Sequence, residues 1–141
     1  MVVQESTTPG DLTWLLQDLV TRVAEVRHAV VLSADGLRVA SSQEIQRDLA
    51  EHVSASASGL QSLARSVSPL FNLGVLRQTV LEFEDGYLFV IAAGHGTCLA
   101  VISGPNSDLG IVAYEMEMLV QRVTEHLATQ PRAHSGQING R

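Results

Sequence analysis

Two neighbouring segments that are apolar on both faces most constrain how this chain can fold. Tyr87–Ala93 and Thr97–Ser103 are short, rich in aliphatic residues, and separated only by Gly94-His95-Gly96. Strands of this kind must be covered on both sides, because neither face can be left in water. The pattern therefore predicts two central strands of a sheet that carries helices on both faces.

The rest of the chain supplies the covering elements and the sheet edges. Apolar residues at i, i+3, i+4 and i+7 predict three helices, and short β-branched runs next to Asp-Gly turns predict three further strands. The fold class is α/β: a single five-stranded, mostly antiparallel sheet in the order α-β-β-α-β-β-β-α. The expected helices are residues 9–25, 46–70 and 108–128, and the remaining strands are 28–33, 37–42 and 76–83. Apolar and polar residues alternate within 37–42 and within 76–83, so these two strands are expected at the two edges of the sheet. The strand 28–33 is expected beside the central pair.

The polar ends of the chain are expected to lie outside this domain. Residues 1–8 are interpreted as a flexible N-terminus and 129–141 as a disordered tail, which leaves one domain over 9–128. The start of the chain shows no signal-peptide pattern, and no apolar run is long enough to span a bilayer. A cytoplasmic protein without direct membrane insertion is therefore expected.

Composition excludes several classes of function. All nine basic residues are arginine, so a Walker A loop and lysine Schiff-base chemistry are excluded. A net charge of −6 argues against a nucleic-acid-binding surface. Cys98 is the only cysteine, which excludes an internal disulfide and a cysteine-rich metal site. No catalytic, cofactor-binding or metal-binding residues are predicted, so we expect a protein that is not an enzyme.

The middle of the 46–70 helix is unusual because it consists of small residues. Serine and glycine weaken a helix, so local propensity does not explain the run 54–59. Ala50, Ala57 and Ala64 recur every seven residues beside a stripe of larger apolar side chains. Two interpretations remain open: a helix packed closely against its own sheet, or a helix that contacts a second copy of itself.

The 76–83 strand favours the second interpretation. It is long, carries Val80, Leu81 and Phe83, and has no proline or lysine to protect its edge. An edge of this kind invites pairing with another strand. We therefore expect a homodimer in which two such edges pair about a two-fold axis. The expected dimer interface comprises Ala50, Ser54, Ala57, Gln61, Ala64, Arg77, Thr79, Val80 and Leu81.

The order of elements and three local motifs resemble the Roadblock/LC7 family of dynein light chain-like domains. The motifs are the Leu12–Leu16 helix start, the Val30–Leu37 hairpin with its Asp35-Gly36 turn, and the serine-rich middle helix. The similarity covers about residues 11–128 and is greatest to actinobacterial Roadblock proteins of conservon operons. It implies a profilin-like sandwich that dimerises through its third strand and second helix.

The same resemblance implies a regulatory role. Members of the MglB-like branch act on the nucleotide cycle of a Ras-like small GTPase, and conservon members work with a sensor-kinase-like protein. The resemblance thus implies a GTPase partner and a sensor-kinase-like partner, with recruitment to a membrane only through partners. It transfers no catalytic residue.

Five side chains are candidates for contacting a partner. Arg47 and Arg65 are expected to point away from the sheet, where an activator could present an arginine to a transferred phosphate, or simply confer solubility. Glu82 and Glu84 could meet a basic patch, or form a solvated turn. Trp14 lies off its helix's main stripe and could anchor an interface or pack at the helix edge.

Other functions remain as alternatives to a dimeric GTPase regulator. One is a scaffold without effect on GTP turnover, and another is a ligand-sensing domain of the PAS or profilin-like kind. An enzyme ranks last, because no nucleophile, base and orienting group are assembled. Cys98 is expected in the core, and His95 in a turn without metal-binding neighbours.

Overall fold

The computed structural model describes residues 9–128, and its strands form one five-stranded antiparallel sheet. The strand order is β2-β1-β5-β4-β3, which confirms both predicted edges and the predicted central pair. The elements are α1 (Pro9–Arg22), β1 (Val26–Ser33), β2 (Arg38–Ser41), α2 (Arg47–Arg65), α3 (Ser68–Phe71), β3 (Gln78–Phe83), β4 (Gly86–Gly94), β5 (Thr97–Ser103) and α4 (Leu109–Ala128). The expected flexible segments, 1–8 and 129–141, lie outside the described residues.

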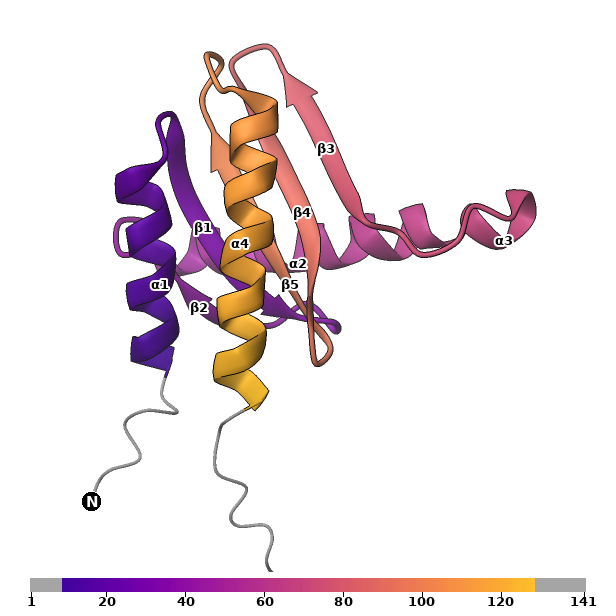
Figure 1. Ribbon diagram of the computed structural model, residues 1–141, viewed down its shortest axis with the longest axis horizontal. Helices are drawn as coiled ribbons and strands as arrows, with labels where there is room; N and C mark the ends of the chain where they lie inside the picture. The colour runs from indigo at the N-terminus through magenta and orange to yellow at the C-terminus, as the bar shows by residue number, and fades with distance from the viewer. Residues whose placement is uncertain (1–8, 129–141) are drawn as a thin grey trace, which may run out of the picture.

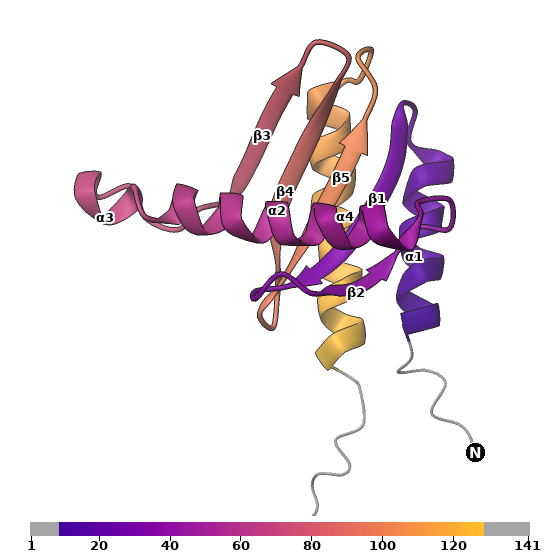
Figure 2. The ribbon, with the colours of Figure 1, turned by 180° about the vertical axis from the view of Figure 1, so that it is seen from behind.

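Helices cover both faces of the sheet, as its doubly apolar central strands require. On one face α1 lies over β1 and β2, while α4 lies over β4 (Figure 1). On the other face α2 alone runs across the strands (Figure 2). The main core lies under α1 and α4, where Leu16, Leu19, Phe89, Leu99 and Met116 are all at most 1 % exposed.

The small residues of α2 face the protein's own sheet. Ala50 and Ala57 are fully buried, and Ala57 packs in a cluster with Leu32, Val90 and Ala100. Because these side chains are short, the helix backbone can lie close to the strands beneath it. The first of the two interpretations of the small-residue run therefore holds over Ala50–Gln61.

This packing corrects part of the predicted dimer interface. Ala50, Ser54, Ala57 and Gln61 are at most 2 % exposed in the single chain, so their side chains are not available to a second copy. Ser54 Oγ donates a hydrogen bond to the carbonyl oxygen of Ala50 within the helix. Ala64, one turn beyond Gln61, is only half-buried.

Two helices end earlier than their apolar patterns predict. The first stops at Arg22 rather than residue 25, and Glu25 adopts a left-handed conformation with φ of 73° before β1 begins. The second stops at Arg65, and a separate turn, α3, begins within the predicted remainder and ends one residue past it. Asn72, with φ of 58°, then ends α3 and reverses the chain toward β3. Left-handed residues of this kind commonly close a helix.

Candidate interaction surface at the β3 edge

β3 is the outermost strand on its side of the sheet and pairs only with β4 among residues 9–128. Its central residues, Thr79, Val80 and Leu81, are half-buried, while Phe83 is 58 % exposed. An apolar strand with one free edge offers unpaired N–H and C=O groups along its length. The edge predicted from the sequence to be exposed is therefore exposed in the folded chain.

α2 covers only part of its face of the sheet. Thr79 Oγ1 donates a hydrogen bond to Gln61 Oε1 at 2.6 Å, which fixes the C-terminal half of the helix over the start of β3. Toward the other end of β3 the strands are uncovered. Leu81, Leu88 and Ile102 lie there in one row, since Leu81 pairs with Leu88 and Leu88 with Ile102.

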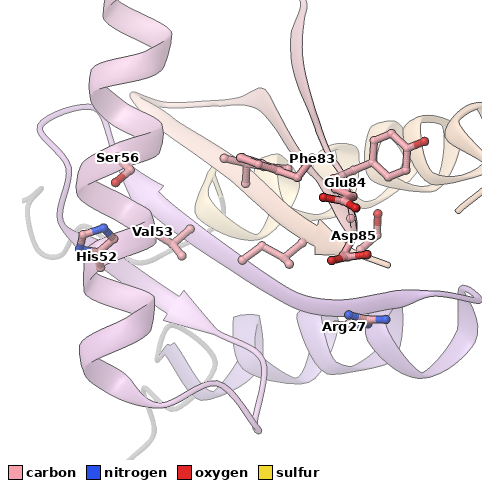
Figure 3. A pocket seen from close by; sticks show the side chains of 12 residues that line it. Arg27, His52, Val53, Ser56, Phe83, Glu84 and Asp85 are labelled. Atoms are coloured by element: carbon pink, nitrogen blue, oxygen red, sulfur yellow. The ribbon is translucent and has the colours of Figure 1, made fainter. Parts of the chain in front are cut away.

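Leu88 and Ile102 of this row form the floor of a hollow of about 550 Å³, and Leu81 is the strand neighbour of Leu88 on β3. Figure 3 shows His52, Val53 and Ser56 of α2 on one side and Phe83, Glu84 and Asp85 on the other. We call Leu81, Phe83, Leu88 and Ile102 the shelf. Its floor is apolar, and the rim of the hollow carries the carboxylates of Glu84 and Asp85 together with the guanidinium of Arg27 (Figure 3), so the shelf suits an apolar segment.

Beyond β3, the end of α2 and the following chain extend past the sheet (Figures 1 and 2). We call residues 63–75 the arm. Six of its apolar side chains are largely exposed: Leu63, Val67, Leu70, Phe71, Leu73 and Val75, with fractions between 43 % and 88 %. A monomeric protein rarely leaves so many large apolar side chains together in water.

Charge is distributed unevenly along the same edge. Arg77 immediately precedes β3, whereas Glu82, Glu84 and Asp85 lie at its end and in the following turn. All four side chains are exposed. The edge is therefore positive at its start and acidic at its end.

The structure brings together the part of the predicted interface that lies outside the core. Ala64 and Arg77 line a second hollow, of about 520 Å³, between the arm and the start of β3. Thr79, Val80 and Leu81 follow along the strand, and Glu82 and Glu84 end it. These residues form one continuous edge.

The three other predicted partner contacts lie apart from this edge and from one another. Trp14, 62 % exposed, is on the α1–α4 face, with the Arg122 guanidinium 5.9 Å from its ring centre. Arg47, at the opposite end of α2, pairs with Glu51 at 3.0 Å. Arg65 lines a small hollow beside Cys98. These three side chains do not form one site.

Groups capable of chemistry are not gathered anywhere in the described part of the chain. Cys98 is 7 % exposed, and burial raises the pKa of its thiol, against the opposing effects of Arg65 and Gln61. No cluster of three or more histidine, cysteine or acidic side chains that could hold a metal occurs within residues 9–128. No helix in that range is long and apolar enough to cross a membrane.

Sequence reasoning missed the arm and the shelf. Leu63 and Val67 have the spacing of an apolar stripe on the 46–70 helix, which by itself predicts packing against the sheet, yet both side chains are exposed. A signal was present after Pro69, where Leu70, Phe71, Leu73 and Val75 are apolar without helical or strand periodicity. Such a run in a connecting segment indicates a contact surface rather than a core.

Comparisons with known proteins define the class to which this fold belongs. The Roadblock/LC7 domain model matches residues 12–103. A Roadblock/LC7 domain from Streptomyces avermitilis is 45 % identical in sequence, with a TM-score of 0.79 over 83 % of this chain and 98 % of that chain. A protein from Methanocaldococcus jannaschii is 30 % identical over 98 residues, 70 % of this chain and 84 % of its own length.

The chain therefore belongs to the Roadblock/LC7 family. The fold is also shared by MglB from Myxococcus xanthus, at 14 % identity and a TM-score of 0.76 over 84 % of this chain and 96 % of that chain. A further solved structure is described as MglB with a tetrameric arrangement, at 13 % identity and a TM-score of 0.77 over 87 % of this chain and 93 % of that chain.

Proposed function

We propose that this protein is a homodimeric regulator that binds a Ras-like small GTPase through the surface that its two copies share. One observation supports dimerisation: an unpaired apolar strand, an exposed arm and an uncovered shelf lie together at one edge of the sheet. Each of these features lacks a partner among residues 9–128 of the single chain. A second copy of the chain would supply a partner for all three features at once.

Antiparallel pairing of two β3 strands fits the three features together. A two-fold axis normal to the sheet keeps both α2 helices on one face and sets the start of each β3 beside the end of the other. The arm of one copy leaves the sheet over the start of its own β3, so it comes to lie over the shelf of the second copy. Leu63 and Val67 then cover apolar floor that is otherwise in water.

The charges agree with this direction of pairing. Arg77 of each copy approaches the acidic end of the other β3, which carries Glu84 and Asp85. Parallel pairing would instead place like charges beside each other, at a cost in free energy. Because facing residues of antiparallel strands lie on the same side of a sheet, Leu81 pairs with Leu81 or Thr79 of the second copy.

Membership of the Roadblock/LC7 family supports the GTPase role, and the absence of any lysine argues against a common nucleotide-binding loop in this chain itself. The partner GTPase holds the nucleotide, and this chain acts on it in the cytoplasm as a regulatory platform without being an enzyme itself. A sensor-kinase-like protein of a bacterial conservon-type operon is the expected further member of the complex. Arg65, at the end of α2 nearest the shared edge, is the arginine of this helix that a bound GTPase would meet, whereas Arg47 lies at the far end.

The test is a nucleotide-turnover assay on a Ras-like GTPase encoded beside this chain. GTP hydrolysis and nucleotide exchange are measured with and without the dimer, and binding is measured by titration calorimetry. Binding together with a changed rate of GTP hydrolysis or nucleotide exchange supports regulation. Binding without a change in either rate supports the alternative, a scaffold. Absence of binding by a verified dimer would refute the GTPase partnership.

The hollow over the shelf favours one other function, a ligand-sensing domain. A cavity of about 550 Å³ with an apolar floor has the size and lining of a small-molecule site. A thermal-shift screen on wild type and on Leu88→Gln separates the two functions. Ligands that stabilise only the wild-type monomer would favour sensing, whereas concentration-dependent stability without ligand favours the dimer.

A further inference from the structure

The opposite edge of the sheet carries a second, independent surface. β2 is the outermost strand there, with β1 as its only strand partner among the described residues. Beside its start lies a hollow of about 510 Å³ lined by Gly36, Leu37, Arg38, Arg47 and Glu51. This hollow joins the β1–β2 turn to the first turns of α2.

Arg38 lies in this hollow with an unsatisfied hydrogen-bond donor. Its Nε is buried and has no hydrogen-bond partner, and its guanidinium makes no ion pair with any described carboxylate. The nearby Glu51 is held by Arg47 at 3.0 Å in a largely exposed pair, which contributes little to stability. The part of the Arg38 side chain that lines the hollow is open to a ligand, so an incoming carboxylate can form a charge-assisted hydrogen-bonded pair with its guanidinium there.

Two further features favour an anionic, partly apolar occupant. Arg47 adds a second guanidinium at the rim. Leu37, 64 % exposed, adds an apolar contact beside the charges.

We propose that this edge binds an extended acidic peptide segment of a partner protein, which adds a strand to β2. An extended chain uses the free backbone groups of β2, and its alternate side chains point to one face. A carboxylate on that face reaches Arg38 and Arg47, and a neighbouring aliphatic side chain contacts Leu37. The surface lies at the sheet edge opposite β3, so the proposal does not depend on the dimer.

The test uses a fluorescein-labelled peptide of alternating glutamate and valine, seven residues long, with fluorescence anisotropy as the readout. The wild type is expected to bind it saturably and to bind the matching lysine–valine peptide at least about tenfold more weakly, because like charges replace the charge-assisted hydrogen bonds. A version N-methylated at alternate residues is expected to lose binding, since it cannot pair with β2. Absence of saturable binding, or equal binding of all three peptides, would overturn the proposal.

Three variants locate the binding. Arg38→Gln is expected to raise Kd about tenfold or more, and Leu37→Ser to raise it by a smaller factor without disturbing the fold. Arg27→Gln, which removes an exposed arginine at the start of β1, serves as the charge-matched control and is expected to leave Kd unchanged. Thermal unfolding by circular dichroism verifies that each variant is folded. Equal Kd values for Leu37→Ser and Arg27→Gln would place the peptide elsewhere and refute the site.

Discussion

Side-chain size decides how α2 sits on the sheet. Ala57 is fully buried in a cluster with Leu32, Val90 and Ala100, and a larger residue would have to push the helix away. Gly59, only two positions along, is exposed, and a Cβ added there would meet nothing within 4 Å. The same helix therefore contains one position that excludes a larger side chain, Ala57, and one that accommodates it, Gly59.

Opposite effects are expected from enlarging these two positions. Ala57→Leu should lower the free energy of unfolding by about 1–3 kcal/mol, because overpacking forces backbone shifts. Gly59→Ala should raise it by about 0.5–1 kcal/mol, because alanine restricts the unfolded chain and favours helix. Urea unfolding followed by circular dichroism measures both values. A neutral Ala57→Leu would show that α2 does not lie as close to the sheet as described.

The buried thiol of Cys98 is expected to make the stability of the protein depend on pH in the alkaline range. Burial raises its pKa, so the unfolded chain loses this proton at a lower pH than the folded chain does. Above about pH 8.5, the unfolded state binds fewer protons, and the free energy of unfolding therefore falls as pH rises.

The Cys98→Ala variant tests this linkage. Between about pH 8 and about pH 10 it should lose less stability than the wild type does, because it lacks the titrating thiol. Urea unfolding at a series of pH values gives the two slopes. Parallel slopes for the two proteins would mean that the thiol titrates alike in the folded and unfolded states.

At the scale of elements, α2 has two different roles along its length. Its first four turns lie on the sheet through small side chains, and its end leaves the sheet with large apolar side chains exposed. Leu49 and Leu63 are both exposed leucines of this helix, at 56 % and 72 %, but only Leu63 belongs to the arm. This contrast provides a matched pair of substitutions.

Leu63→Ser is expected to weaken dimerisation by about tenfold or more, because it removes apolar area that the second copy's shelf would cover. Leu49→Ser should leave the dimer constant within about twofold, since it lies at the other end of α2. Sedimentation equilibrium gives both dissociation constants. Equal effects of the two substitutions on the dissociation constant would show that the arm is not part of the dimer interface.

At the scale of the whole molecule, the sequence predicted the central pair of strands and both edges, because polarity patterns report how many faces of a strand are covered. Tyr87–Ala93 and Thr97–Ser103 had to be central, and 76–83 had to be outermost. Predictions that depended on which side of a helix meets the sheet were weaker. Ala50, Ser54, Ala57 and Gln61 were assigned to a second copy, although they contact the chain's own sheet.

The physical reason for this error is that small side chains permit close approach without specifying the approaching surface. Sequence periodicity placed the alanines on one stripe of the helix, but the same stripe can face a sheet or another helix. The sites at the two edges are not visible in the sequence for a similar reason, because each is assembled from separate elements. The shelf combines residues from β3, β4 and β5, and the Arg38 hollow combines a hairpin turn with a helix start.

The central claim is that the β3 edge and the arm join two copies of this chain. Sedimentation velocity on the wild type and on Leu81→Lys, over a wide range of concentrations, tests it most directly. The wild type should sediment as a species of twice the 15.1 kDa chain mass, and Leu81→Lys, which places a charge where the strands would meet, should sediment as a folded monomer. A wild type that remains monomeric at every concentration, or a Leu81→Lys variant that dimerises equally well, would contradict the account.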